Sequence, residues 1–236
     1  MERYVRRLVV VAAFFVASLL GATACGQNTE RSDGLDASGS SSSELLEASD
    51  FGEGYELHPG SSAGELAEQQ RHSVATREYT PAVCEQVFAQ QADRTEASQR
   101  RGIYVEHERP YKPSFGDFVT RGGESLEQTR EVYRQCGSFT AVVAGEGEIS
   151  MTTTERPVPP GIDTESLVIE TVVTTEPYPD NPNSVPAQQK SLIGHAQLGD
   201  KRVTFYEEIF GFDSALDTGR FDELFVRAVE RASTAD

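Results

Sequence analysis

The sequence predicts an α+β domain with a mostly antiparallel sheet, flanked by helices and holding one disulfide. Helices and short strands come first along the chain. Consecutive strand patterns joined by short turns follow, and an amphipathic helix closes the chain, an order typical of antiparallel sheets. No pattern repeats at a fixed period, and no G-x-G-x-x-G or Walker motif is present, so a nucleotide-binding α/β domain is not indicated.

Residues 1–24 have the features of a secretion signal peptide. Three arginines precede an apolar run at 8–20, and the small residues Ala22 and Ala24 precede Cys25. The run is shorter than the roughly 20 apolar residues that a membrane-spanning helix needs. We therefore expect this segment to be cleaved.

The end of the signal, Ala22-Thr23-Ala24-Cys25, resembles the lipobox of bacterial lipoproteins, whose cysteine is linked by a thioether to diacylglycerol. The resemblance implies a lipid anchor on Cys25 at the extracytoplasmic face of the cell membrane. Acyl chains such as palmitate contribute roughly 0.8 kcal/mol per buried CH₂, and two or three of them hold a protein firmly. The alternative is an ordinary signal peptide cut after Ala24, which leaves a free cysteine.

Residues 25–44 predict the lipidated cysteine and a flexible tether, followed by one extracytoplasmic domain over 45–236. The tether is rich in Gly, Ser, Asp, Asn and Thr, with a serine run at 40–43. A chain of this kind has a root-mean-square span of roughly 25 Å. This length is enough to carry a domain clear of the lipid headgroups.

The charge of the chain excludes two classes of partner. The whole chain carries −17, and residues 1–24 hold three Arg and one Glu, so the mature chain carries −17 − 2 = −19. Binding to nucleic acid or to anionic lipid needs clustered Lys and Arg. We therefore expect no nucleic-acid partner and a domain that stands off the membrane surface.

The cysteine count favours one disulfide. With Cys25 assigned to lipid, Cys84 and Cys136 remain, an even number in an oxidising compartment. A bond between them closes a loop of about fifty residues, which contributes roughly 4 kcal/mol in the chain-entropy model. The alternative is two buried thiols, and a redox-active pair is disfavoured because no C-x-x-C motif is present.

The first part of the domain alternates short helices and strands. Residues 44–47 predict a helical turn, and 51–57 a turn that enters a strand. The segment 61–74 is ambiguous, but Ser62 and Glu65 match a capping box for a short helix.

Two helices with apolar stripes are predicted around the cysteines. Thr80 as N-cap and Pro81 at the first position open one helix through residue 91, and the second spans 124–136 and ends before a glycine. Strands are expected between them at 102–108 and 115–121. The stripes contain Cys84, Val87 and Phe88 in the first helix and Leu126, Thr129, Tyr133 and Cys136 in the second. A disulfide would therefore join helix to helix.

The remainder is rich in strands and ends in a helix. A glycine-containing link joins 138–144 to 148–154 as a hairpin, and 165–175 is apolar on both faces, as in a covered central strand. A proline-rich loop at 178–186 leads to strands at 191–198 and 202–210. Asp217 or Thr218 caps a final helix over 220–232, whose apolar stripe contains Phe221, Leu224, Phe225, Ala228, Val229 and Ala232.

The sequence predicts no catalytic residues, no metal site and no cofactor. Neither a G-x-S-x-G nor an S-x-x-K motif surrounds a serine. His195 lies within a predicted strand, opposite in direction to Leu192 and Ala196, and a half-exposed structural histidine is favoured over a catalytic one. His107 between two glutamates is typical of a solvated edge. The Asp and Asn residues near the Pro loop and the last helix lack a calcium-binding loop, and Asp near a helix start is ordinarily a cap.

Aromatic residues in loop and edge segments mark a candidate cleft, because ligand pockets are lined by aromatic and apolar groups. The ordinary alternative is that each belongs to the core. The set contains Phe51, Tyr55, Tyr104, Tyr111, Phe115 and Phe118.

Three segments, at 49–55, 79–84 and 132–140, resemble actinobacterial, mycobacterial-type lipoproteins of unassigned function. More distantly, they are similar to the extracellular sensor domains of PknH-type receptor kinases. The resemblance covers about residues 45–233. It implies a sheet with helices, a disulfide between Cys84 and Cys136, and a cleft suspected of ligand binding.

Together these observations predict a membrane-anchored cell-envelope lipoprotein with a ligand-binding or sensor-like module. Its expected partners are the membrane, through the anchor, a small molecule or lipid in the cleft, and an envelope protein. Two alternatives stay open: an envelope hydrolase that uses His195 or an acidic pair, and a structural surface protein.

Overall fold

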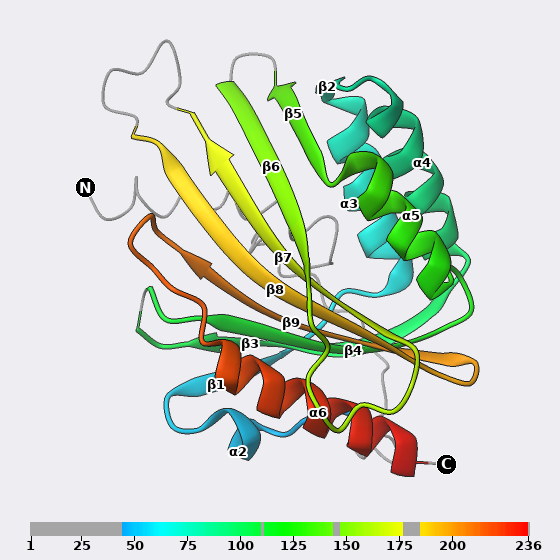
Figure 1. The fold of residues 1–236 in the computed structure, drawn as a ribbon, viewed down its shortest axis with the longest axis vertical. Coiled ribbons are helices and arrows are strands. Elements are labelled where there is room, and N and C mark those ends of the chain that lie inside the picture. Colours follow the sequence, from blue (N-terminus) through cyan, green and yellow to red (C-terminus); the bar gives the residue numbers. More distant parts are fainter. Residues whose placement is uncertain (1–43, 110, 144–146, 177–184, 236) are drawn as a thin grey trace, which may run out of the picture.

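A computed structural model describes residues 44–109, 111–143, 147–176 and 185–235. The predicted signal peptide, Cys25 and the predicted tether up to residue 43 lie outside these residues. The described part is built on one nine-stranded antiparallel sheet with the order β1-β3-β4-β9-β8-β7-β6-β5-β2 (Figure 1). In chain order the elements are α2 (Ala48–Phe51), β1 (Tyr55–Pro59), α3 (Ala63–Ala75), β2 (Arg77–Thr80), α4 (Val83–Glu96), β3 (Gln99–His107), β4 (Ser114–Arg121), α5 (Leu126–Cys136), β5 (Ser138–Val143), β6 (Gly147–Arg156), β7 (Ser166–Thr175), β8 (Ala187–Leu198), β9 (Lys201–Phe210) and α6 (Thr218–Thr234).

The predicted α+β class is confirmed, and so is the run of hairpins. From β5 to β9 each strand pairs with the next one in the chain, and β4 and β3 continue the sheet beyond β9. Helices cover both faces: α6 packs on one, and α3, α4 and α5 on the other (Figure 1). Within the described ranges, none of the helices combines the length and apolar character that crossing a bilayer requires.

The core on the α6 face forms as the sequence predicts. The six residues of the predicted stripe are all buried, and the Asp217 side chain accepts a hydrogen bond from the Arg220 N–H at 3.1 Å. Gly194 on β8 lets the helix approach the sheet, because a Cβ there would lie 2.6 Å from the Phe225 ring. We call this the α6-side core; strands β4, β8 and β9 supply Phe115, Leu192 and Phe205 to it.

The opposite face holds the second core, which we call the disulfide-side core. Its helices α4 and α5 are joined by a disulfide between Cys84 and Cys136, as predicted, with Cα atoms 5.6 Å apart. Beside the disulfide, the rings of Tyr79, Phe88 and Phe139 pack with centroids 5.3 to 5.6 Å apart.

Local capping signals set the helix starts on this face. The Ser62 hydroxyl accepts a hydrogen bond from the Glu65 N–H, and the Glu65 carboxylate accepts one from the Ser62 N–H. The capping box is therefore confirmed, and it opens a helix of 13 residues in the segment that was ambiguous. Ser125 and Gln128 form the same arrangement at the start of α5.

The prediction of Thr80 as an N-cap is wrong. Thr80 is the last residue of β2, where it pairs with Thr140 of β5, and α4 begins at Val83 without a side-chain cap. The strand β2 itself was not predicted. Pairing with the distant β5 recruits this segment to the sheet edge, so the helix starts later and continues to Glu96.

The helical turn predicted at 44–47 forms instead at Ala48–Phe51. Glu44 is buried against the sheet, where its carboxylate forms ion pairs with Arg101, Arg121 and Lys201. These contacts hold the start of the segment on the sheet, and the helix begins only after it.

One row of polar side chains crosses the disulfide-side face of the sheet. Thr171 on β7 lies opposite Ser191 on β8, which lies opposite Glu208 on β9, which lies opposite Ser114 on β4. All four are buried. Glu208 accepts a hydrogen bond from the Ser114 hydroxyl at 3.1 Å, whereas the Thr171 and Ser191 hydroxyls have no hydrogen-bond partner in the described part of the chain.

Candidate functional site

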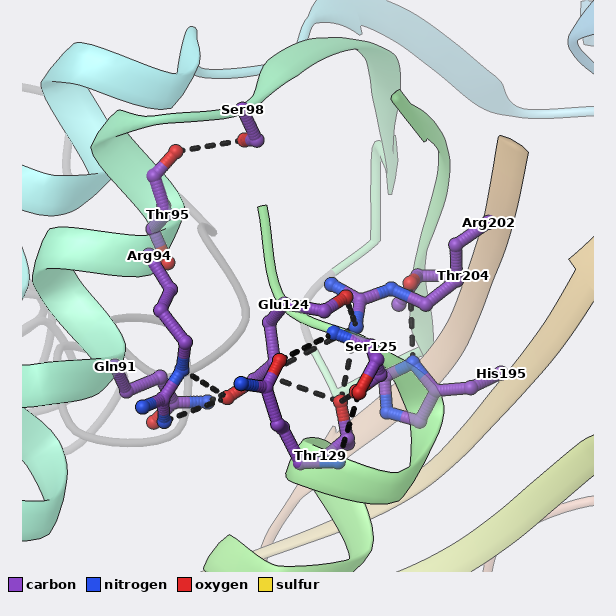
Figure 2. A network of polar contacts seen from close by, with 11 residues as sticks. Gln91, Arg94, Thr95, Ser98, Glu124, Ser125, Thr129, His195, Arg202 and Thr204 are labelled. Atoms are coloured by element: carbon purple, nitrogen blue, oxygen red, sulfur yellow. Dashed lines mark hydrogen bonds and ion pairs between the residues drawn. The ribbon is translucent and has the colours of Figure 1, made fainter. Parts of the chain in front are cut away.

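A polar cavity of about 50 Å³ lies between helices α3, α4 and α5 and the sheet. Figure 2 shows the polar contacts around it. Three helices, four strands and the turns beside them supply its wall, so the cavity forms only when the helices pack on the sheet. The lining residues are Leu66, Gln70, Gln91, Arg94, Thr95, Ser98, Arg100, Thr120, Glu124, Thr129, Tyr133, His195, Arg202 and Thr204.

Strand register places the floor of the cavity. Arg100 on β3 lies opposite Thr120 on β4, and Thr120 lies opposite Arg202 on β9. His195 on β8 lies opposite Thr204, two residues beyond Arg202 on the same face of β9. The alternation of strand side chains therefore gathers these polar groups under the helices.

Helical spacing places the other wall. Gln91 and Arg94 are three residues apart on α4, and Thr129 and Tyr133 are four apart on α5, so each pair shares one helix face. Glu124 sits just before the N-cap of α5. Its side chain reaches between the two helices (Figure 2).

The Glu124 carboxylate is the centre of the network. It accepts hydrogen bonds from Arg94 Nη2 at 2.9 Å, Arg94 Nε at 3.1 Å and the Thr129 hydroxyl at 3.0 Å, with Gln91 Nε2 at 3.5 Å. Arg202 Nη1 lies 3.9 Å from the carboxylate, and it donates to the Glu124 main-chain carbonyl and to the Thr129 hydroxyl, each at 2.9 Å. One carboxylate thus serves two guanidinium groups.

Arg202 is held in the cavity with part of its hydrogen-bonding capacity unused. Its Nε is buried and has no partner among the described residues. Burial lowers the pKa of the Arg202 guanidinium, while Glu124 acts in the opposite direction. The Arg202 guanidinium therefore carries its positive charge where little water can solvate it.

His195 is buried, with 5 % of its surface exposed, so the prediction of a half-exposed strand histidine is wrong. Tyr133 of α5 covers it, with ring centroids 6.4 Å apart. Its predicted direction is confirmed, since Leu192 and Ala196 pack in the α6-side core. Burial, and then the nearby Arg202 charge, lower the pKa of His195 to about 3. The ring is therefore neutral at physiological pH.

In the described part of the chain, one of the two ring nitrogens of His195 has a hydrogen-bond partner and the other has none. Nδ1 lies 3.1 Å from the Thr204 hydroxyl, and Nε2 is buried without a hydrogen-bond partner in the described part of the chain. A hydroxyl that donates to Nδ1 leaves the proton on Nε2, which then becomes a donor.

Arg100 closes the cavity beside an aromatic stack. Its guanidinium lies 3.6 Å from the centroid of the Phe118 ring, which stacks on Tyr206 at 5.9 Å. Gly102 permits this arrangement, because a Cβ at that position would overlap the Phe118 ring. Arg100 Nη1 also donates to the Ser61 carbonyl at 2.9 Å.

Two solved structures are similar to this chain, whereas no protein-family model and no curated protein matches it. One is an uncharacterised protein (Rv0999 ortholog) from Mycobacterium smegmatis, with 14 % identity over 78 % of this chain and 92 % of that one, and a TM-score of 0.41. The other is the extracellular domain of PknH from Mycobacterium tuberculosis, with 13 % identity over 80 % and 94 % of the two chains, and a TM-score of 0.40. The distant similarity predicted from the sequence motifs is confirmed.

The six aromatic residues of the predicted cleft do not line one cavity. Phe51, Tyr55 and Phe115 belong to the α6-side core. Tyr104 and Phe118 belong to the disulfide-side core, and Tyr111 is 67 % exposed between β3 and β4.

Strand periodicity explains this division. Phe115 and Phe118 are three residues apart on one strand, so they point to opposite faces. Of the six, Phe118 alone approaches the polar cavity, as the support of Arg100.

His107, a weak metal candidate in the sequence, makes local contacts. Its Nδ1 accepts a hydrogen bond from the Arg109 N–H at 2.9 Å, and its ring packs edge-on against Tyr55. Among the described residues, no group of three His, Cys, Asp or Glu side chains could hold a metal ion.

The sequence contained one weak signal for the cavity. Thr129 interrupts the apolar stripe of α5, and it is the residue that contacts both Glu124 and Arg202. The charged residues of the site gave no signal of their own, because a single Arg or Glu in a helix or strand is most often solvated.

Proposed function

We propose that the chain is a cell-envelope lipoprotein, anchored through Cys25, whose extracytoplasmic domain binds a small polar ligand in this cavity. One observation carries the proposal: Glu124 is shared between Arg94 and Arg202 in a buried space where further polar atoms have no partner. Buried polar groups normally find a partner, and unsatisfied ones mark a place where a bound molecule would complete the network.

The size of the cavity selects a small molecule over a lipid. A water molecule needs roughly 10 to 15 Å³ of such volume, so 50 Å³ holds roughly three to five water-sized groups. An acyl chain needs a longer and apolar space. The small-molecule version of the expected partner is therefore the one that we propose.

The proposed location has two supports. The lipobox resemblance supports a lipid on Cys25, and the Cys84–Cys136 disulfide is of the kind that persists in oxidising compartments outside the cytoplasm. The charge of −19 in the mature chain, obtained above as −17 − 2, disfavours contact with anionic headgroups.

The hydrolase alternative is weaker because His195 is poorly suited to act as a base. A general base works best with a pKa near the operating pH, whereas the pKa of His195 is lowered to about 3. Thr204 is the hydroxyl beside it, but no carboxylate in the described part of the chain orients the ring through Nε2. Ligand binding requires neither a general base nor a carboxylate that orients it.

A ligand panel tests the proposal. The purified full-length protein is screened by thermal shift and native mass spectrometry against small polar metabolites and, as a second arm, envelope lipids. A ligand at 100 times its Kd stabilises the folded state by about 2.7 kcal/mol, which is roughly 5 to 10 °C in Tm for a chain of this length. If no small polar compound shifts Tm, the binding function is wrong and the structural surface protein becomes the better proposal.

The anchor has its own test in cell fractionation. Cys25→Ser should move the protein from the membrane pellet to the soluble fraction. Cys84→Ser, the matched control, should leave it in the pellet. Absence of an acyl mass on Cys25 in the protein from its native host would contradict the anchor.

A further inference from the structure

The residues that line the cavity carry more positive than negative charge. Glu124 is the one carboxylate among its lining residues, and both Arg94 and Arg202 depend on it. Resting on the proposed binding function, we infer that the ligand is a small hydroxycarboxylate, of the size of glycolate.

The charge balance selects an anion. Two partly buried guanidinium groups share one buried carboxylate, and charges removed from water are stable only when they are paired. Arg100, the third cation in the wall, adds to the positive potential while making its own contacts with Ser61 and Phe118. A bound carboxylate would supply the missing negative charge, in a planar form that matches a guanidinium.

Two unpartnered donors point to where the carboxylate binds. Arg202 Nε and His195 Nε2 are both buried without partners in the described chain on the sheet floor, and Nε2 is a donor when the Thr204 hydroxyl donates to Nδ1. They lie on the neighbouring strands β9 and β8. A carboxylate there would accept from both without displacing Glu124 from Arg94.

Two unpartnered acceptors indicate the second group of the ligand. Gln70 Oε1 on α3 and Gln91 Oε1 on α4 are buried, line the cavity and have no hydrogen-bond partner in the described chain. These two amide oxygens need a hydrogen-bond donor from the ligand. A hydroxyl fits this requirement better than an ammonium, because the surrounding excess of positive charge repels a second cation.

The volume agrees with this chemistry. Glycolate has five non-hydrogen atoms, which matches the space of roughly three to five water-sized groups. Longer carboxylates with chains of several carbons do not fit.

Isothermal titration on the full-length protein tests the inference, at constant ionic strength set with sodium chloride. The probes are glycolate, lactate, acetate, glycine and ethylene glycol. We expect glycolate to bind most tightly and lactate more weakly because it is larger. Acetate should bind roughly fivefold more weakly than glycolate because it lacks one neutral hydrogen bond, and glycine and ethylene glycol more weakly still.

Three variants and one control identify the site. Arg202→Gln should weaken glycolate binding at least tenfold, and Gln70→Leu should make glycolate no better than acetate. Glu124→Gln should tighten glycolate binding, because it removes the internal carboxylate that competes for both arginines. Arg134→Gln is the matched control, since this exposed arginine on α5 pairs with Glu131 away from the cavity, and it should change nothing.

The outcomes separate the two proposals. If ethylene glycol or glycine binds as tightly as glycolate, or if Glu124→Gln weakens glycolate binding, the hydroxycarboxylate inference is wrong while the binding function stands. If neither these probes nor the wider panel bind, the binding function itself fails. Should Arg202→Gln not fold by circular dichroism, the Glu124→Gln and Gln70→Leu comparisons decide.

Discussion

Cys84 and Cys136 form a disulfide within the disulfide-side core, with Cα atoms 5.6 Å apart and a sequence separation of 52. The bond ties α4, which carries Gln91 and Arg94, to α5, which carries Thr129. The two helical walls of the cavity are therefore held together covalently.

Loss of this disulfide should destabilise the domain. The double variant Cys84→Ala/Cys136→Ala is expected to lose about 4 kcal/mol, the loop-closure value for this separation. Urea unfolding followed by circular dichroism measures the loss. Cys25→Ala serves as the control and should unfold at the wild-type midpoint. A loss under about 1 kcal/mol would show that packing alone holds α4 against α5.

Thr129 on α5 and Thr171 on β7 are both buried on the disulfide side of the sheet. Removal of the hydroxyl should change the free energy of unfolding in opposite ways at these two positions. Thr171 Oγ1 has no hydrogen-bond partner in the described chain, whereas Thr129 Oγ1 contacts Glu124 and Arg202. Thr171→Val should leave the free energy of unfolding unchanged or raise it by up to about 1 kcal/mol, and Thr129→Val should lower it by about 1 to 3 kcal/mol. Equal losses in urea unfolding would mean that Thr171 has a partner after all.

The buried His195 should make the protein sensitive to acid. Its pKa is about 3 in the folded chain and about 6.5 when unfolded, so only the unfolded chain binds this proton between those values. Its contribution to stability is therefore complete above pH 6.5 and is lost as the pH falls towards 3.

His195→Gln removes this dependence. Between pH 7.5 and 4.5 the variant should gain about 3 kcal/mol relative to wild type, because two pKa units correspond to that free energy. The comparison uses urea unfolding of both proteins at both pH values, so that carboxyl groups common to the two cancel. A difference that does not change with pH would contradict a buried neutral histidine.

Elements specified by local sequence were predicted well. The stripe of α6 and its Asp217 cap need no information from elsewhere in the chain, and both are as predicted. Strand β2 has four residues and is specified by pairing with β5, some sixty residues later, which no local pattern reveals. The same pairing makes Thr80 the last residue of a strand instead of a helix cap.

The candidate site was harder to predict than the fold. Its polar residues come from helices and strands distant in sequence, and each one alone matches a solvent-facing position. Alternation could have corrected the aromatic prediction, since Phe115 and Phe118 cannot share a face. The charge balance around Glu124 could not have been found, because it depends on which helix covers which strands.

The close contact between Gly194 and Phe225 gives a final prediction. A Cβ at Gly194 would lie 2.6 to 2.7 Å from three atoms of the Phe225 ring. The ring is fully buried beside Phe221, with centroids 5.8 Å apart. Gly194→Ala should therefore cost about 1 to 3 kcal/mol, as overpacking does.

Gly64 on α3 is the matched control, because a Cβ there meets no atom within 4 Å. Gly64→Ala should raise the free energy of unfolding by about 0.5 to 1 kcal/mol through helix propensity. Phe225→Leu should lower stability in the wild type, yet it should recover part of the loss caused by Gly194→Ala, since a smaller side chain relieves the overlap. If the two losses simply add in urea unfolding, the contact between Gly194 and Phe225 does not limit how closely α6 packs on β8.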